Sequence, residues 1–259
     1  MNFHAILIFM NIGIIGFGRF GQVMAKILKP NHNIITANRS DKSKIAKKLG
    51  IKYSDLNKVC KQELIILAVP IREIGNLIQK IQPMLKPGTI LMDTCSVKEY
   101  PIKIMKKYLP ADIEILGTHP MFGPDSIKYG LRKLQIVFCP ANIQKENLEK
   151  IKAIFKNLAL QIIQVSAKEH DKQTALSLCL VHFIGRGLGK MKTKLEPIHT
   201  LNFNRLLKIQ ESVTNDSLEL FQDMQKYNKY AKEQRKSLIN ALQNIDKKLL
   251  SDKLKSNAK

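Results

Sequence analysis

Residues 12–21 read Ile12-Gly13-Ile14-Ile15-Gly16-Phe17-Gly18-Arg19-Phe20-Gly21. An apolar run of strand character is followed by a GxGxxG pattern and then by an amphipathic, helix-like stretch. In this context Gly16 permits a tight turn, Gly18 lets the backbone approach a pyrophosphate, and Gly21 lets the helix pack close to the strand. The helix N-terminus then offers N–H groups and a positive dipole end to the phosphates. The stretch therefore predicts a dinucleotide site.

The end of the second expected strand indicates which dinucleotide binds. About 20 residues beyond the glycines, NAD-selective sites usually place an acid for the ribose 2′-hydroxyl. This chain has Asn38-Arg39-Ser40 there, and Arg39 and Ser40 can both bond a 2′-phosphate, which favours NADP over NAD. A surface arginine is the alternative, and Asp41 is expected to be a helix N-cap. The expected cofactor residues are Gly16, Phe17, Gly18, Arg19, Phe20, Gly21, Asn38, Arg39, Ser40, Val69 and Pro70.

Short apolar runs alternate with polar, helix-like stretches over the first 165 residues, as in βαβ units around a parallel sheet. The expected strands are residues 12–15, 34–37, 64–69, 89–92, 113–116, 135–138 and 161–165. Beyond Ser166 the periodicity is helical, with one long helix at 168–191 and further helices at 204–250. We therefore expect an α/β fold, with an N-terminal Rossmann-like, doubly wound parallel sheet in residues 1–165 and a C-terminal all-helical domain in residues 166–259.

The composition is that of a folded but strongly basic protein. Of the 259 residues 44% are hydrophobic, and 43 Lys and Arg against 21 Asp and Glu give a formal charge of +22. This charge would attract nucleic acid, anionic membranes or anionic metabolites. Scattered lysines such as Lys44, Lys47 and Lys106 are more typical of solvated helix faces, so we expect no nucleic-acid and no membrane partner.

The cysteines and the chain's opening bear on its location. Cys60, Cys95, Cys139 and Cys179 lie far apart without a CxxC pair, which predicts reduced thiols in a cytoplasmic protein, and no metal site is expected. The apolar opening lacks the basic region and cleavage site of a signal peptide, and residues 1–9 are expected to be an N-terminal extension. No other segment approaches the roughly 18 apolar residues of a membrane span.

Two more motifs follow expected strands, namely Asp93-Thr94-Cys95-Ser96-Val97-Lys98 and Gly117-Thr118-His119-Pro120-Met121-Phe122-Gly123-Pro124. The helical part carries Glu169-His170-Asp171-Lys172 and Leu180-Val181-His182-Phe183-Ile184-Gly185-Arg186. Together these runs closely resemble the prephenate/arogenate dehydrogenase family, over nearly the whole chain from residue 10 to about residue 250. The Asn38–Asp41 turn and the stretch from Leu206 through Ser217 are most similar to plant-type, NADP-dependent arogenate dehydrogenases.

The resemblance implies an oxidative decarboxylation in tyrosine biosynthesis. A ring carbon that bears a hydroxyl would give hydride to NADP while the ring carboxylate leaves as carbon dioxide. His119 would be the catalytic acceptor of the hydroxyl proton, because neutral imidazole works near physiological pH, and Ser96 would orient that hydroxyl. A structural histidine that caps a strand end is the alternative for His119.

The substrate's two carboxylates would need cations, for which Arg186 and either Arg205 or Lys208 are candidates, and the full set of candidate substrate residues is Lys98, His182, Arg186, Arg205, Lys208 and Asp216. The cations would bind carboxylates, although Lys98 could equally be solvated and His182 a packed core residue. Asp216 matches an acid of the plant-type enzymes and would pair with the ammonium group of arogenate, which disfavours prephenate. An ordinary exposed aspartate is the alternative.

Other functions stay open. The first alternative is a prephenate dehydrogenase that forms 4-hydroxyphenylpyruvate, and the next is another NADP-linked enzyme of the β-hydroxyacid or imine-reducing group. A non-catalytic NADP-binding sensor and a basic nucleic-acid-binding protein belong to different classes, and charge alone supports the second. The helical domain has more apolar surface than one Rossmann domain would cover, so we expect a homodimer formed through it.

Overall fold

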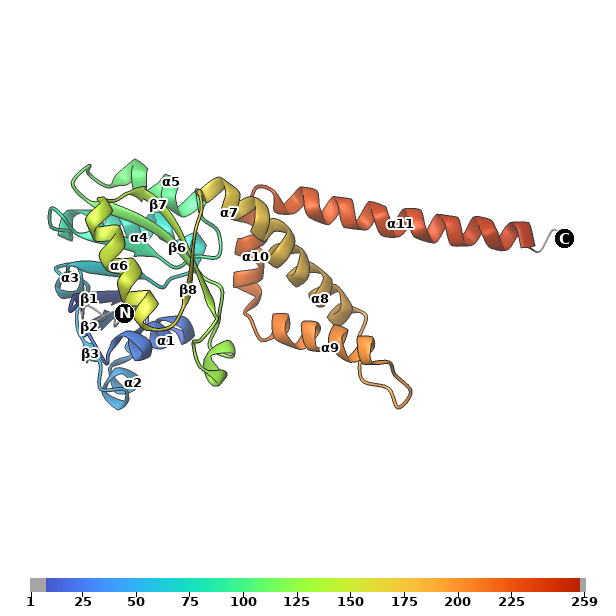
Figure 1. Ribbon diagram of the computed structural model, residues 1–259, viewed down its shortest axis with the longest axis horizontal. Coiled ribbons are helices and arrows are strands. Elements are labelled where there is room, and N and C mark those ends of the chain that lie inside the picture. Colours follow the sequence, from blue (N-terminus) through green and yellow to red (C-terminus); the bar gives the residue numbers. More distant parts are fainter. Residues whose placement is uncertain (1–7, 257–259) are drawn as a thin grey trace, which may run out of the picture. The chain divides into compact units, whose positions relative to one another are not determined.

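The computed structural model describes residues 8–256, and describes residues 129 and 252–256 in their backbone only. It divides the chain into two units, residues 1–170 and 171–259, each described separately below. Among the described residues, the first unit contains all the strands and the second is helical (Figure 1). The expected α/β class with a helical C-terminal part is thus confirmed, whereas most of the expected extension, residues 1–7, lies outside the described residues.

An eight-stranded sheet in the order β3-β2-β1-β4-β5-β6-β7-β8 forms the first unit. Pairing is parallel except between β6 and β7, which are antiparallel, so the expected doubly wound parallel sheet is confirmed with one antiparallel pair. The strands are β1 Asn11–Ile15, β2 Asn33–Ala37, β3 Lys52–Tyr53, β4 Leu64–Leu67, β5 Ile90–Asp93, β6 Glu114–Pro120, β7 Gln135–Asn142 and β8 Gln161–Gln164.

The helices of the first unit connect these strands. They are α1 Arg19–Leu28, α2 Ser43–Lys48, α3 Leu56–Val59, α4 Ile74–Ile81, α5 Glu99–Tyr108, α6 Lys145–Asn157 and, reaching into the second unit, α7 Ala167–Thr174, with short 3-10 turns η1 Ile71–Glu73, η2 Gln82–Met84 and η3 Ser126–Tyr129. Asp41 lies just before α2 and its carboxylate accepts the Ser43 N–H at 2.8 Å, although the N-cap itself is Lys42 and not Asp41 as expected.

Side chains of the central strands point alternately to the two faces of the sheet, and those on each face pack into the core. Ile12 and Ile14 of β1 lie in one apolar cluster with Met24 of α1 and Phe155 of α6. Successive side chains of a strand point to opposite faces, so Gly13 faces the other layer, where an added Cβ would come within 2.6 Å of the Val59 carbonyl. Helices therefore cover both faces of the sheet, as in a doubly wound fold.

Two local expectations needed correction. The strand expected at residues 113–116 runs on to Pro120, because β7 pairs with β6 from Ile115 to Pro120, and so the Gly117–Pro120 run lies inside β6. The two-residue strand β3 was not expected, since Lys52–Tyr53 is too short to carry an alternating pattern.

The second unit continues α7 through the π-helical turn η4 Ala175–Leu180 into α8 Val181–Lys190, followed by α9 Leu201–Thr214, α10 Leu218–Tyr227 and α11 Ala231–Ser256. The helix expected at 168–191 is therefore interrupted by a π turn. Two side chains that follow α9 in the chain donate hydrogen bonds to the backbone of α7 and η4. Gln225 donates to the Cys179 carbonyl at 2.6 Å, and Asn228 donates to the Asp171 carbonyl at 2.8 Å. Such contacts can satisfy carbonyls that a π turn displaces from the regular helical pattern.

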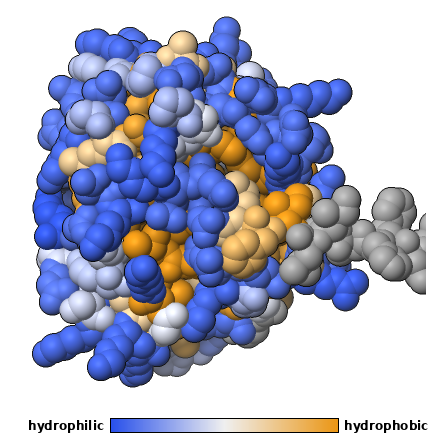
Figure 2. All heavy atoms as spheres, turned by 90° about the vertical axis from the view of Figure 1, so that its left-hand side faces the viewer, coloured by the Kyte–Doolittle hydropathy of each residue, from blue (hydrophilic) through white to orange (hydrophobic). Residues whose placement is uncertain are grey.

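Many of the charged side chains lie on the surface. Figure 2 shows that the pictured side of the first unit is covered mainly by hydrophilic residues. Lys44, Lys47 and Lys106 are all exposed, as solvated helix faces require. Within residues 8–256, none of the helices combines the length and the apolar character that crossing a bilayer needs.

Candidate active site

The glycine-rich loop lies at the carboxyl end of β1 and has the geometry of a phosphate cradle. Gly16 has a φ of +98°, which side-chain-bearing residues rarely adopt, and a Cβ on Gly21 would collide with the Gly16 carbonyl. Gly18 caps α1 and faces open space, with nothing within 4 Å of where its Cβ would be. The loop therefore fits a pyrophosphate beside the first N–H groups of α1.

The loop is tied to the end of β2 by one side chain. Asn38 accepts the Phe17 N–H at 2.9 Å and donates to both the carbonyl and the hydroxyl of Ser40. Arg39 points into solvent, with 91% of its side chain exposed and its Nη1 atom 3.9 Å from the Glu73 carboxylate. Arg39 and Ser40 thus follow closely after the carboxyl end of β2, which ends at Ala37.

The remaining expected cofactor residues lie in the loop or follow β4. Phe17 is buried, and the Phe20 ring lies 6.2 Å from that of Phe122. Arg19 pairs with Asp125 at 3.1 Å. Val69 would touch a side chain placed at Gly16, and Pro70 after it is exposed. All of these residues belong to the same unit as the loop.

A buried polar cluster joins the carboxyl-terminal half of β5 to β6. Lys98 is fully buried, and its ammonium group contacts the Asp93 carboxylate and the Thr118 carbonyl. The Thr118 hydroxyl donates to the Asp93 carbonyl at 2.6 Å, and the Cys95 N–H donates to the Asp93 carboxylate. Burial raises the pKa of Asp93, and the Lys98 ammonium opposes that rise. The alternative of a solvated lysine is therefore wrong, because Lys98 is fully buried, whereas its contact with the substrate stays a prediction.

His119 lies inside β6 next to this cluster and is paired with another histidine. Its Nδ1 atom is 2.8 Å from Nε2 of His170, and the rings meet edge to face. Burial lowers the pKa of His119 well below the usual 6.5, and the nearby His170 and Lys98 lower it further. His119 is therefore neutral at physiological pH and able to accept a proton. It is the next-to-last residue of β6, near the carboxyl end of that strand.

Ser96 follows β5, the strand that pairs with β6. It is buried, and its hydroxyl has no hydrogen-bond partner among the described residues. A buried hydroxyl without a partner is costly, which fits a group reserved for a ligand. Nothing in the sequence pointed to a role for His170, although it belongs to the Glu169–Lys172 motif. Its contact with His119 is visible only in the folded structure.

The second unit brings three expected substrate residues together. His182 is 5% exposed and its Nε2 atom lies 3.6 Å from the Asp216 carboxylate. Burial lowers the pKa of His182, Arg186 lowers it too, and Asp216 opposes them. The Arg186 guanidinium donates to the carbonyls of Val213, Asp216 and Ser217 at 2.6–3.2 Å and lies over the Phe221 ring. Arg186 thus holds the turn between α9 and α10.

The two other expected cations, Arg205 and Lys208, are exposed on α9. Arg205 donates to the Asn202 side chain at 2.9 Å. In the described part of the chain, no three His, Cys, Asp or Glu side chains come together as metal ligands would.

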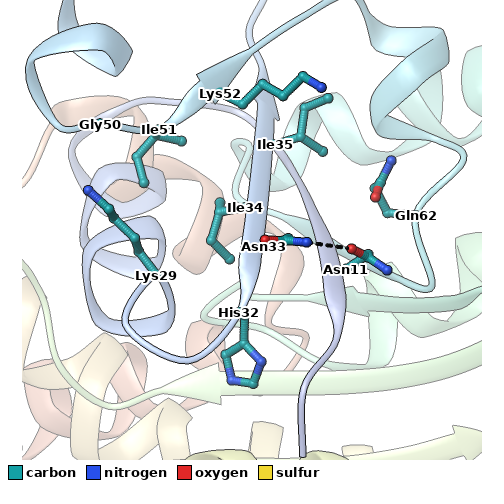
Figure 3. A pocket seen from close by; sticks show the side chains of 10 residues that line it. All are labelled: Asn11, Lys29, His32, Asn33, Ile34, Ile35, Gly50, Ile51, Lys52 and Gln62. Carbon is teal, nitrogen blue, oxygen red and sulfur yellow. Dashed lines mark hydrogen bonds between the residues drawn. The ribbon is translucent and has the colours of Figure 1, made fainter.

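A separate pocket of about 520 Å³ opens at the opposite, amino-terminal ends of β1, β2 and β3. Figure 3 shows Asn11 and Asn33 hydrogen-bonded to each other beside the strands, with the Lys29 and Lys52 side chains directed apart. None of the expected site residues lines it. Its position excludes it as the dinucleotide site, because ligands of open α/β sheets bind at the carboxyl ends of the strands.

Comparisons with known proteins agree with this arrangement. The family model "Prephenate dehydrogenase, nucleotide-binding domain" matches residues 24–164, and "TYRAAT1-like, C-terminal domain" matches residues 187–259. The chain is 34% identical to "Arogenate dehydrogenase 2, chloroplastic" of Arabidopsis thaliana over 93% of its own length and 70% of that protein. It is 35% identical to "Arogenate dehydrogenase 1, chloroplastic" of the same plant, of which it spans 40%.

The fold has a counterpart among solved structures. A Synechocystis arogenate dehydrogenase superposes with a TM-score of 0.69, at 21% identity, over 94% of this chain and 93% of that one. The likeness therefore extends across both units and not only across the dinucleotide-binding half.

Proposed function

Because this chain belongs to the prephenate/arogenate dehydrogenase family, we propose that it oxidatively decarboxylates arogenate to tyrosine with NADP as the hydride acceptor. The observation that carries the proposal is the buried, neutral His119 in the strand beside the Ser96 loop. A prephenate dehydrogenase that forms 4-hydroxyphenylpyruvate is the alternative, and a non-catalytic NADP-binding protein is a weaker one.

His119 acts as the general base. If its Nδ1–H donates to Nε2 of His170, its own Nε2 carries the free lone pair that accepts the proton of the ring hydroxyl. Ser96 hydrogen-bonds the same hydroxyl and orients it. Aromatisation of the ring and loss of carbon dioxide drive the step, so the chain mainly supplies proximity and a proton acceptor.

The glycine loop and the Asn38–Ser40 turn hold the cofactor. The bound nicotinamide supplies the electron-pair acceptor for the hydride. Gly18 gives the pyrophosphate room, and Arg39 and Ser40 bond the 2′-phosphate. This assignment is supported by the exposure of Arg39 and by the absence of an acid at the last residue of β2, which is Ala37. NAD is expected to bind more weakly.

Asp216 selects the amino acid side chain of the substrate. Its carboxylate is held 3.6 Å from His182, while Arg186 bonds its carbonyl. It can attract the ammonium of arogenate, which prephenate lacks. Arg205 and Lys208 are the exposed cations proposed for the carboxylates, and Arg186, engaged with three carbonyls, keeps Asp216 and His182 in position.

The chain further acts as a cytoplasmic homodimer, without nucleic-acid or membrane partners. Support for the dimer comes from α11, whose apolar residues Leu242, Ile245 and Leu249 are exposed at intervals of three and four residues, as in a helix that packs along another. The two Arabidopsis relatives are named chloroplastic, so the compartment is a point to test by localisation of the tagged chain.

Four assays test the function: reduction of NADP and of NAD, each with arogenate and with prephenate. Fastest turnover with NADP and arogenate is expected. A His119→Asn variant should lose about 10²- to 10⁴-fold in kcat yet still bind NADP, whereas His199→Asn, which alters an exposed histidine, should match the wild type. If turnover is fastest with prephenate, the chain is a prephenate dehydrogenase. If neither substrate is turned over, the chain is a non-catalytic NADP-binding protein.

A further inference from the structure

An ion pair crosses the carboxyl end of β1. Arg39 follows β2, and Glu73 ends the 3-10 turn η1 after β4. Strands β2 and β4 are the two neighbours of β1 in the sheet, and β1 leads directly into the glycine loop. Arg39 Nη1 lies 3.9 Å from Glu73 Oε1, so the two side chains meet beyond the carboxyl end of β1. The adenosine half of the cofactor is expected in the same place.

The pair is weak and easily exchanged. The side chains of Arg39 and Glu73 are 91% and 40% exposed, and exposed pairs at such distances contribute little to stability. A 2′-phosphate carries more negative charge than a carboxylate and can form a bidentate fork with a guanidinium. Arg39 can thus leave Glu73 for a phosphate, but the Glu73 carboxylate stays close to the new anion.

Glu73 is also the acid of this region whose carboxylate approaches Arg39. Asp41, the other acid near the end of β2, accepts the N–H and the hydroxyl of Ser43 at 2.8 and 3.1 Å, and these bonds lower its pKa. The Asp41 carboxylate is therefore already hydrogen-bonded to the first residue of α2. The Glu73 carboxylate, in contrast, has Arg39 as its charged partner.

We propose that Glu73 limits the preference of this chain for NADP by competing with the ribose 2′-phosphate for the Arg39 guanidinium. The inference rests on the proposed NADP-dependent function. With NADP, Arg39 turns from Glu73 to the phosphate, and the freed carboxylate opposes the phosphate's charge. With NAD, the Arg39–Glu73 pair persists, so Glu73 restrains the preference for NADP that Arg39 creates.

The test is calorimetric titration of the full chain with NADP and with NAD. Glu73→Gln should tighten NADP binding by about three- to tenfold and leave NAD binding unchanged or weaker, because only the phosphate competes for Arg39. The gain should shrink in concentrated salt, since exposed charges are screened there. In an Arg39→Gln background, the same Glu73→Gln change should produce a smaller gain.

Glu146→Gln is the control, because it removes another exposed acid, paired with Lys150, from helix α6; its side chain is 77% exposed, against 40% for Glu73. An equal gain in that variant would mean that net charge alone acts, and would overturn the proposal. So would a Glu73→Gln chain that binds both cofactors as the wild type does, or a gain that is undiminished without Arg39. If the wild type bound neither cofactor, the proposed function itself would fail, which separates the two failures.

Discussion

The Nδ1 atom of His119 lies 2.8 Å from the Nε2 atom of His170, and both imidazoles are buried. Two such rings cannot both hold a positive charge at this distance without strong repulsion. His170 therefore orients His119 and helps to keep it neutral, in addition to the effects of burial and of the Lys98 ammonium. It is a positioning residue for the proposed base.

The first prediction concerns the pH profile. His119 works only when neutral, and its pKa is lowered, so kcat/KM should hold as the pH falls through 6.5 and decline only below it. His170→Gln removes one cause of the lowering, which should move the acidic decline toward higher pH and reduce kcat. Binding of NADP should be unchanged. An acidic limb at the same pH in both proteins would contradict this role of His170.

The second prediction concerns the buried Asp93–Lys98 pair. Lys98→Met leaves the Asp93 carboxylate buried and without its cation, which should lower the free energy of unfolding by about 3–5 kcal/mol in urea titrations. Adding Asp93→Asn should recover part of the loss, since the uncompensated charge disappears. Lys128→Met, at an exposed lysine paired with Asp125, should change stability by less than about 1 kcal/mol. A Lys98→Met chain as stable as the wild type would contradict the assigned pairing.

The third prediction separates two glycines of the loop. Gly18→Ala meets open space, so the unfolding free energy should stay unchanged while NADP binding weakens by about tenfold or more, because the methyl group fills the place of the pyrophosphate. Gly21→Ala collides with the Gly16 carbonyl and should cost about 1–3 kcal/mol of stability as well. Normal NADP binding by Gly18→Ala would mean that the cofactor does not approach this loop.

The fourth prediction addresses the choice of substrate. Asp216→Asn removes the charge proposed to attract the arogenate ammonium, so the ratio of kcat/KM for arogenate to that for prephenate should fall about tenfold or more. The same change removes an influence that raises the pKa of His182, so that pKa should fall further. Glu211→Gln, at an exposed acid of α9, should leave the ratio unchanged. A similar fall in both variants would point to net charge and not to Asp216.

The fifth prediction tests the proposed dimer. Leu242→Glu together with Ile245→Glu places two charges in the exposed apolar row of α11, which should convert a dimer to a monomer in size-exclusion chromatography at micromolar concentration. Gln243→Glu adds a charge outside that row and should leave the elution unchanged. A wild type that elutes as a monomer would sink the proposal.

Local sequence patterns were sufficient for the features that depend on neighbouring residues. The GxGxxG loop, the buried runs of β1, β2 and β4 and the helical C-terminal part follow from periodicity and from glycine geometry, which residues close in the chain determine. The family resemblance rested on contiguous motifs in the same way, and the matches over residues 24–164 and 187–259 agree with it.

Contacts between distant segments could not be derived in this way. The antiparallel pairing of β7, the π turn at Ala175–Leu180 and the contact between His119 and His170 depend on which segments meet after folding. Lys98 shows the difference most clearly, because a lysine in a polar loop looks solvated until Asp93 and Thr118 enclose its ammonium group. The sequence by itself determined the βαβ order, the phosphate loop and the residue types available for chemistry. Only the tertiary structure decided which of them are buried, paired and neutral, because burial and charge pairing depend on neighbours in space and not on neighbours in the chain.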